Sequence, residues 1–446
     1  MLHPLPVTDQ CRRAADDDLR VLVVGAGIAG LTVAGLLRRR GHRPVVVERR
    51  REDADPGYML ALMPIVDAAL EELGAREAYR SASTPLRRYR VLSHRGAPLR
   101  TDDMTDIVGE YGDYRGIGRG PLVDVLTQEG CDVAFGTTVT GLEEHDGGPV
   151  AVEFSTPGDA RGPAAADRGS TTGEFDAVIV ADGLHSGTRL LLPGPLATVD
   201  GVDTGWGGWV VWVGLDPSDE PAEELAEPPD GGAGPGSDES ASGAGADLGV
   251  ELWGSGFFLG SYPVKGALGA FLGGPEELTA AGPEAYVERV RSELSTITPR
   301  TGRLLRALQE AEDPFFWPLT DVRARRWASG RTVLLGDAAA GFLPTAGIGA
   351  GMAMESAWML AGALDGAAAA DVPQRLAAYE TAQRPRVEAA QDTSRRLARI
   401  MFRGGRLMAG LRDLAARATS VEVAVKPILR LLQHPADPGV FRRQPE

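Results

Sequence analysis

The chain has 446 residues, of which 43% are hydrophobic and 24% charged, as in globular proteins with two or three domains. No apolar run approaches the ~20 residues of a membrane span, two cysteines cannot form a disulfide framework, and six scattered histidines lack metal-ligand spacing. Ten of the 62 acidic residues fall within 216–247, so the net charge of −16 is partly local. The chain has no excess of basic residues that would indicate nucleic-acid binding. Because the first residues also lack the apolar core of a signal peptide, we expect a cytoplasmic protein without metal, membrane or nucleic-acid partners.

The N-terminal part of the chain predicts a parallel strand–helix–strand unit. Residues 21–24 have the pattern of a short buried strand and are expected to be the first ordered element. A glycine-rich turn over 25–30 follows, then a helical stretch over 31–40 that ends at Gly41, and a second strand over 44–48.

Further elements alternate along the rest of the chain, with spacing typical of a mixed α/β protein. They are helices over 62–74 and 120–128, a hairpin over 86–100, strands over 177–180, 206–213, 249–272 and 332–335, and helices over 283–310 and from 350 to about 431. Residues 215–248 are rich in Gly, Pro, Ser, Ala and acidic residues, which cannot bury enough apolar surface to order themselves. We therefore expect a mobile acidic insertion there.

The pattern Gly25-x-Gly27-x-x-Gly30 indicates a dinucleotide site because it lies between a buried strand and a helix. In such a turn the first glycine allows the tight bend, the second lets the backbone approach a pyrophosphate, and the helix N-terminus offers free N–H groups. Glu48 ends the next strand about 20 residues on, where it can accept the ribose hydroxyls. An ordinary strand–turn–helix that uses glycine for packing would show the same pattern.

Three segments resemble motifs of one enzyme family. The stretch DAVIVADGLHSGTR (176–189) resembles the DG motif of class A flavoprotein monooxygenases, the para-hydroxybenzoate hydroxylase-like family. The stretch GRTVLLGDAAAGFLPTAGIGAGMAMESA (330–357) resembles the GD motif of that family, and residues 117–122 resemble its arginine helix. The resemblance extends from about residue 20 to 390, with the motifs in the order that the family has.

This resemblance implies an α/β fold with a Rossmann-like FAD-binding domain, a discontinuous β-sheet substrate domain and C-terminal helices. The expected boundaries are 19–85, 105–200 and 318–395 for the FAD-binding domain, 86–104 and 201–317 for the substrate domain with its insertion over 215–248, and 396–446 for the C-terminal helical segment.

The resemblance also implies non-covalently bound FAD, with NAD(P)H as a transient reductant because the chain has no second glycine-rich nucleotide motif. By the family pattern, Glu48 holds the adenosine ribose, Arg119 lies by the ribose and pyrophosphate, and Asp337 binds the ribityl chain. The candidate cofactor-binding residues are Gly25, Gly27, Ile28, Ala29, Gly30, Glu48, Arg49, Arg119, Asp182, Asp337, Pro344, Gly347, Gly349, Ala350, Gly351 and Met352. A helix cap for Asp337 and a turn aspartate for Asp182 are the alternatives.

The chain departs from the family pattern beside the expected flavin. Ala340 stands where histidine is usual, and Ile348, Gly351 and Ser356 stand where Gln, Asn and Asp are frequent. Each change removes a polar group, and oxygen chemistry depends on stabilising charge near the ring.

The substrate domain shows no identifiable catalytic residue. Five aromatic residues on predicted strands can either form an apolar substrate wall or pack between layers; they are Trp206, Trp209, Trp212, Trp253 and Tyr262. In a strand, Trp206 and Trp212 share one face and Trp209 takes the other. His185 is expected on the surface of its loop.

The function favoured by the resemblance is an FAD-dependent monooxygenase that hydroxylates an aromatic or polyketide-like natural-product intermediate through a flavin hydroperoxide. The alternative is an FAD-bound non-redox natural-product cyclase with the flavin as scaffold, since cyclisation needs only a shaped, largely apolar cavity. A flavin-dependent halogenase fits poorly, because the WxWxIP motif is absent and the two lysines, Lys265 and Lys426, lie outside the expected place. The expected partner is a large, apolar small molecule, and the oligomeric state stays open.

Overall fold

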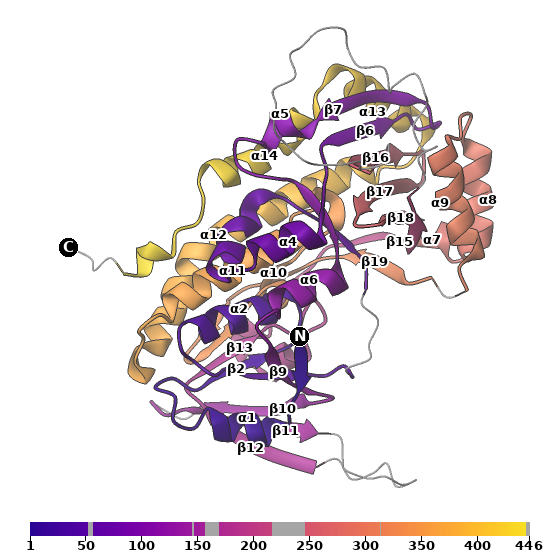
Figure 1. The fold of residues 1–446 in the computed structure, drawn as a ribbon. Coiled ribbons are helices and arrows are strands. Elements are labelled where there is room, and N and C mark those ends of the chain that lie inside the picture. Colours follow the sequence, from indigo (N-terminus) through magenta and orange to yellow (C-terminus); the bar gives the residue numbers. More distant parts are fainter. Residues whose placement is uncertain (52–56, 145–146, 157–168, 216–245, 313, 443–446) are drawn as a thin grey trace.

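A computed structural model describes residues 1–51, 57–144, 147–156, 169–215, 246–312 and 314–442. Within these residues the strands form two seven-stranded sheets and three smaller ones. Figure 1 shows the two large sheets toward opposite ends of the molecule, with helices between them and the C-terminal helices along one side. This mixed α/β architecture confirms the predicted fold class.

The first sheet contains the predicted strand–helix–strand unit. Its strands, in spatial order, are β1 (Leu2–Pro4), β9 (Cys131–Phe135), β3 (Val45–Glu48), β2 (Val21–Val24), β13 (Ala177–Val180), β22 (Thr332–Leu334) and β21 (Ala328–Ser329). Neighbouring strands are parallel except β21 and β22. Every residue of β2 and β13 is buried, which explains their unbroken runs of Val, Leu, Ile and Ala. The strands predicted over 21–24 and 177–180 are confirmed.

The expectation that β2 is the first ordered element is wrong. Strand β1 pairs in parallel with β9, and helix α1 (Val7–Arg13) follows it. The amide of Gln10 accepts a hydrogen bond from the backbone N–H of Val46 at 2.8 Å and donates to the carbonyl of the same residue at 3.2 Å. These contacts and the burial of Val7 hold the N-terminal residues against the edge of the first sheet, where β1 pairs with β9 and Gln10 bonds to β3.

Helices pack on and beside the first sheet. They are α2 (Ile28–Arg39), α3 (Asp67–Glu72), α4 (Arg76–Ala82), α6 (Arg119–Leu126), α10 (Asp337–Ala340), α11 (Gly349–Ala363) and α12 (Val372–Met401), with 3₁₀ turns at Pro64–Val66, Thr188–Leu191, Gly194–Leu196, Pro344–Ala346 and Ala369–Asp371. Helix α11 lies between α2 and α12 and is apolar on nearly all sides, as an interior helix must be. Its buried charge, Glu355, is paired with Arg386 at 2.8 Å.

The described residues also form three smaller sheets. They are β10 (Thr138–Glu144), β11 (Val150–Thr156) and β12 (Gly169–Phe175); β4 (Met59–Leu62), β8 (Arg115–Gly118) and β5 (Thr84–Pro85); and β14 (Val199–Asp200) with β20 (Val322–Ala324). The sequence patterns did not indicate the β10–β11–β12 sheet.

The second sheet carries the predicted hairpin at one edge. Its spatial order is β19 (Phe316–Thr320), β15 (Asp203–Gly214), β18 (Ala267–Pro275), β17 (Phe258–Val264), β16 (Leu248–Trp253), β6 (Arg88–Leu92) and β7 (Pro98–Asp103), followed in the chain by α5 (Met104–Val108). Strands β6 and β7 pair antiparallel, which confirms the hairpin. Alternate residues of the sheet pack with α7 (Glu276–Thr279), α8 (Pro283–Glu293) and α9 (Pro299–Glu310).

The predicted insertion over 215–248 ends earlier than expected. Residues 216–245 lie outside the described part of the chain. Leu248, however, is buried and begins β16, and Asp247 pairs with Arg88 at 2.6 Å. The boundary was misplaced because the acidic, glycine-rich composition runs directly into the strand.

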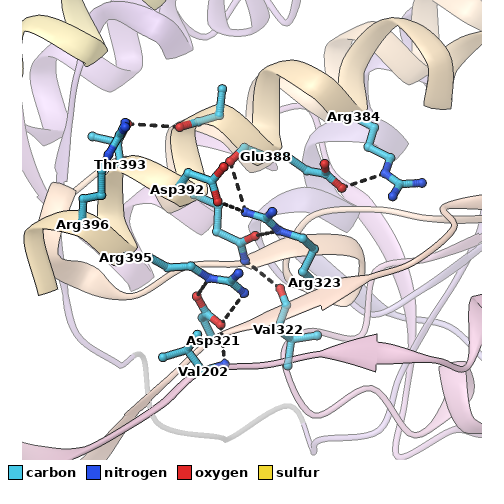
Figure 2. Close-up of polar contacts among 12 residues, drawn as sticks. Val202, Asp321, Val322, Arg323, Arg384, Glu388, Asp392, Thr393, Arg395 and Arg396 are labelled. Carbon is cyan, nitrogen blue, oxygen red and sulfur yellow. Dashed lines mark hydrogen bonds and ion pairs between the residues drawn. The ribbon is translucent and has the colours of Figure 1, made fainter. Parts of the chain in front are cut away.

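A polar cluster joins helix α12 to the segments that lead into and out of the second sheet (Figure 2). Arg395 forms two hydrogen bonds with the carboxylate of Asp321, at 2.7 and 2.9 Å, and Asp321 also accepts a hydrogen bond from the N–H of Val202. Arg323 donates to the side-chain oxygen Oε1 of Gln391 at 2.5 Å and to the carboxylate of Asp392 at 2.6 Å. One helix therefore holds the two segments by which the chain enters β15 and leaves β19.

The C-terminal helices α13 (Arg406–Ala418) and α14 (Val421–Gln433) precede a 3₁₀ turn at Pro438–Phe441. Helix α13 contacts β7, and the guanidinium of Arg412 donates to the backbone carbonyls of Met401, Trp253 and Gly254. Helix α13 is thereby fixed to the loop that follows β16.

Candidate active site

A single continuous cavity of about 2060 Å³ extends from the carboxyl ends of β2, β3 and β13 to one face of the second sheet. Pockets for one small molecule usually measure about 300–1,000 Å³. The cavity therefore has room for two: a ligand along the first sheet and another against the second. In doubly wound sheets ligands bind at this carboxyl end.

The three glycines of the first turn have three different physical roles. Gly25 has a φ of 106°, and a Cβ there would lie 2.5 Å from the carbonyl oxygen of Ala181. At Gly30 a Cβ would overlap the carbonyl oxygen of Gly25, so only glycine lets α2 approach the turn this closely. At Gly27 no atom lies within 4 Å of an added Cβ, and this position faces the cavity. The open N–H groups that start α2, at Ile28 and Ala29, face the same space.

Glu48 is held against this turn. Its Oε2 accepts a hydrogen bond from the N–H of Ala26 at 2.9 Å, and its Oε1 accepts one from the N–H of Arg50 at 2.8 Å. Each oxygen keeps a further acceptor site, since an ionised carboxylate has about four. Arg49 lines the same part of the cavity, and Arg119, the first residue of α6, lines its wall.

The DG segment connects the first sheet to α10. Asp182 accepts a hydrogen bond from the N–H of Thr188 at 3.1 Å through Oδ2. Its Oδ1 is buried and has no hydrogen-bond partner among the described residues. Arg189, 5% exposed, donates to the carbonyl oxygen of Ala338 at 2.7 Å, so the DG segment holds the helix that begins at Asp337. Asp182 is thus a turn residue on the cavity wall that keeps one buried carboxylate oxygen without a partner among the described residues.

Asp337 begins α10 and projects into the cavity. Its carboxylate is open to the cavity but enclosed by protein, and this burial raises its pKa from 3.8 to about 6. The preceding Gly336 has a φ of 59°, and a Cβ there would lie 2.7 Å from the side chain of Ala29. The starts of α10 and α2 therefore meet at the first sheet.

The GD segment continues along the cavity to α11. Pro344, Gly347, Gly349 and Ala350 line it, with Gly347 in the left-handed region at φ 60°. The first N–H groups of α11 have no acceptor within the helix. Like the start of α2, this helix N-terminus offers donors and the positive end of a helix dipole.

Three of the predicted contact residues lie beneath the cavity wall instead of on it. Gly30 packs on the glycine turn, and Gly351 packs on Ile65. Met352 is 1% exposed and donates its N–H to the carbonyl of Ile348. Along α11, therefore, only Gly349, Ala350 and Ala353 line the cavity. Gly30, Gly351 and Met352 support the site through close packing behind the wall.

The predicted aromatic residues of the second sheet divide between the two expected roles. Trp212, Trp253 and Tyr262 line the cavity. Trp206 and Trp209 are 6% and 5% exposed and do not line it. Trp206 packs directly behind the cavity wall, against Phe402 at the end of α12, whereas Trp209 packs on the other face of the sheet toward α8. Some of the five aromatic residues therefore form a wall of the cavity, and the others pack between layers. His185 lies exposed in its loop, as expected, at the edge of the cavity.

The sequence matches the family described as an FAD binding domain over residues 18–394. The chain belongs to this family. It is 31% identical over 405 residues to 3-amino-4-hydroxybenzoate 2-monooxygenase of Streptomyces cremeus, covering 86% of this chain and 88% of the relative. It is 28% identical to the aurachin C monooxygenase/isomerase of Stigmatella aurantiaca, with 84% and 86% of the two chains covered. This FAD-binding protein is an FAD-dependent monooxygenase, as the resemblance implied.

The fold of this FAD-binding protein is similar to that of Klebsiella pneumoniae HpxO, solved with FAD and uric acid. The TM-score is 0.73 at 22% identity, with 93% of this chain and 97% of the other covered. The similarity confirms the predicted Rossmann-like fold with a second β-sheet region.

The residues along the first sheet fit FAD. The glycine turn and two open helix N-termini suit a pyrophosphate and an electron-rich ring, since both prefer N–H donors and a positive dipole end. Acceptors at Glu48, Asp337 and the unpartnered Oδ1 of Asp182 suit the hydroxyls of a ribose and a ribityl chain. The positions that depart from the family pattern affect this fit little, because three of the four, Ala340, Gly351 and Ser356, do not line the cavity. Only Ile348 does.

Sequence patterns missed one group of cavity residues, which comprises Glu251, Tyr89 and Tyr114. A signal for Glu251 was present, since it is a charged residue in the middle of a predicted buried strand. The tyrosines gave no signal, because their meeting depends on the pairing of strands that are distant in sequence.

No helix of the described residues is long and apolar enough to cross a membrane. In the same part of the chain no three His, Cys, Asp or Glu side chains lie close enough together to bind a metal ion. The cytoplasmic location and the lack of a nucleic-acid partner stay predictions.

Proposed function

We propose that this FAD-dependent monooxygenase hydroxylates a large, mainly apolar aromatic substrate, held between FAD on the first sheet and the aromatic face of the second. The observation that carries the proposal is the single cavity that joins Asp337 and the glycine turn to Trp212, Trp253 and Tyr262. The similarity to the S. cremeus monooxygenase, which is named for an aromatic acid, supports the aromatic nature of the substrate, and the large size and apolar character are inferred from the cavity.

The proposal assigns FAD to the first sheet, with the domain boundaries that the sequence suggested. Glu48 would hold the adenosine ribose, Arg119 the ribose and pyrophosphate, and Asp182 and Asp337 the ribityl side. The backbone at Gly27–Ala29 would face the pyrophosphate, and the start of α11 would face the flavin ring. These roles use acceptors for hydroxyl groups and N–H donors for negative charge, as the chemistry requires.

Bound FAD supplies the oxygen activation, which no protein side chain can provide. The role of the protein chain is to bind FAD and the substrate, to orient them and to enclose them. The N–H donors and the positive dipole end at the start of α11 would stabilise negative charge on a flavin ring held beside them. The apolar lining by Ile348 and Phe271, among others, keeps water away from the reacting atoms.

The electron donor would be NAD(P)H that binds transiently in the FAD cleft. The chain has one glycine-rich dinucleotide motif, and FAD occupies it under this proposal. No cysteine or histidine of the described residues lies on the first-sheet wall beside Asp337 apart from His185, so we also propose that FAD is held without a covalent bond.

The decisive experiment combines a visible spectrum with steady-state NAD(P)H oxidation over a panel of aromatic compounds. A yellow protein that releases FAD on denaturation, and whose NAD(P)H and O₂ consumption is stimulated by an aromatic compound that gains one oxygen, supports the proposal. Product formation without NAD(P)H consumption would instead support the cyclase, which the apolar Ile348 at the start of α11 favours.

A further inference from the structure

A carboxylate and two phenols meet on the face of the second sheet that lines the cavity. Strand β16 lies between β6 and β17, and the register places Tyr89 and Tyr262 on either side of Gly249. Glu251 follows two residues later on the same face. Because Gly249 has no side chain, the side chain of Glu251 can extend into the space between Tyr89 and Tyr262. Tyr262 donates its hydroxyl hydrogen to Oε1 of Glu251, and the indole N–H of Trp253 donates to Oε2 at 2.8 Å.

The polar partners of Glu251 are neutral. Its side chain is 8% exposed, yet no Arg, Lys or His within the described ranges lies within ion-pair distance of it. Buried carboxylates are normally paired with a cation, because burying an unpaired charge is costly. Tyr89 also hydrogen-bonds the carboxylate, so three neutral donors, Tyr89, Tyr262 and Trp253, occupy three of its acceptor sites. An ionised carboxylate has about four such sites, so Glu251 keeps one for a ligand in the cavity that it lines.

The surrounding tyrosines remain neutral donors. Burial raises the pKa of Tyr89 and of Tyr262 well above the usual value, and the negative charge of Glu251 raises both further. Tyr114 responds in the same way, through burial first and then through Glu251. Its hydroxyl lies 3.7 Å from the position of a Cβ on Gly347, so this group adjoins the turn that leads into α11. Glu251 therefore presents its carboxylate to the cavity among neutral donors, whereas two cations of the cavity lining have partners of their own: Arg100 pairs with Asp102, and Arg412 donates to the backbone carbonyl of Met401.

We propose that Glu251 anchors the substrate: it accepts a hydrogen bond from a hydroxyl or amino group on the aromatic ring, and it excludes a ring carboxylate from the same position. This proposal rests on the proposed function, which assigns the substrate to the half of the cavity along the second sheet. Its physical basis is that a like charge placed opposite a buried charge is strongly disfavoured, whereas a neutral or cationic donor satisfies an acceptor that is already desolvated.

The test compares two ligands of one shape, 2-naphthol and 2-naphthoate, with the FAD-loaded enzyme. Binding is measured from the perturbation of the flavin absorbance, so the readout needs no turnover. The wild type is expected to bind 2-naphthol at least about tenfold more tightly than 2-naphthoate. Glu251→Gln keeps the size and an acceptor oxygen but removes the charge, and it is expected to bring the ratio close to one, mainly through tighter naphthoate binding.

Two variants serve as controls. Glu310 also lines the cavity but is exposed at the end of α9, so Glu310→Gln removes the same charge and is expected to leave the ratio unchanged. Tyr262→Phe removes a neutral donor and leaves the carboxylate, so the preference for naphthol should persist or increase. A ratio unaffected by Glu251→Gln, or lost in Tyr262→Phe alone, would overturn the proposal.

The outcome for the anchor is separable from that for the proposed function. If the ratio collapses in Glu251→Gln but no aromatic compound stimulates NAD(P)H oxidation, Glu251 is the anchor of a site with another chemistry. If aromatic compounds stimulate oxidation but Glu251→Gln leaves the ratio intact, the monooxygenase stands and the anchor is refuted.

Discussion

Acidification should weaken FAD binding through Asp337. Enclosure by protein raises the pKa of this carboxyl to about 6 in the protein without cofactor. In the proposed role the carboxylate accepts hydrogen bonds from ribityl hydroxyls, so the bound form favours ionised Asp337 and lowers its pKa. By linkage, FAD binding then releases a proton below pH 6 and loses affinity as the pH falls through that value.

The size of the effect follows from the pKa. With a value near 6, almost all Asp337 is ionised at pH 8, about half at pH 6 and about a tenth at pH 5. The association constant for FAD should therefore fall about twofold at pH 6 and about tenfold at pH 5 relative to pH 8.

The assay is a titration of the apoprotein with FAD, followed by the quenching of flavin fluorescence between pH 5 and pH 8. Asp337→Asn is the matched control, since it keeps the shape and removes the titration; its affinity should be lower at pH 8 and nearly constant with pH. A wild-type affinity that is flat or rises on acidification, or the same decline in Asp337→Asn, would refute the reasoning.

Three further predictions concern packing and the cavity wall. Gly30→Ala should lower the thermal unfolding temperature, because the new Cβ overlaps the glycine turn, whereas Gly27→Ala should keep that temperature and weaken FAD binding. Melting curves and a flavin titration measure the two effects, and equal melting temperatures for the two variants would contradict the packing argument. Trp209→Ala should cost about 3–5 kcal/mol in urea unfolding, while Trp212→Ala, whose indole is 44% exposed on the cavity wall, should leave stability within about 1 kcal/mol and raise the KM for substrate. Arg395→Ala should cost about 3–5 kcal/mol in the same experiment, because it leaves a fully buried aspartate without its cation; a loss below about 1 kcal/mol would mean that the pair contributes little.

Sequence patterns located the first sheet and most of the expected FAD site because their signals are local. Strands such as β2 and β13 are buried on both faces, so their composition alone marks them. Glycines at 25, 27 and 30 are required by the turn itself, and Asp182 and Asp337 follow strands directly. Local signals, however, could not distinguish a glycine that faces a ligand from one that packs against a neighbouring turn.

The parts that sequence patterns missed depend on long-range pairing. Strand β1 has three residues and gains its place from β9, more than a hundred residues later. The meeting of Tyr89, Tyr262 and Glu251 requires the register of three strands from two separate segments of the chain. The roles of Trp209 and Trp212 likewise became distinct only when the helices took one face of the second sheet.

The order of strands in the first sheet has a consequence for the life of the protein in the cell. Strands β2, β13 and β22 are neighbours, although they begin at residues 21, 177 and 332. Walls of the FAD cleft therefore come from the start and from the last third of the chain, and a ribosome that has released only the first 300 residues has exposed no complete cleft. Flavin loading should begin only after β22, α10 and the start of α11 have left the ribosome, so the cofactor would stabilise chains that include these elements and leave shorter ones to the proteases.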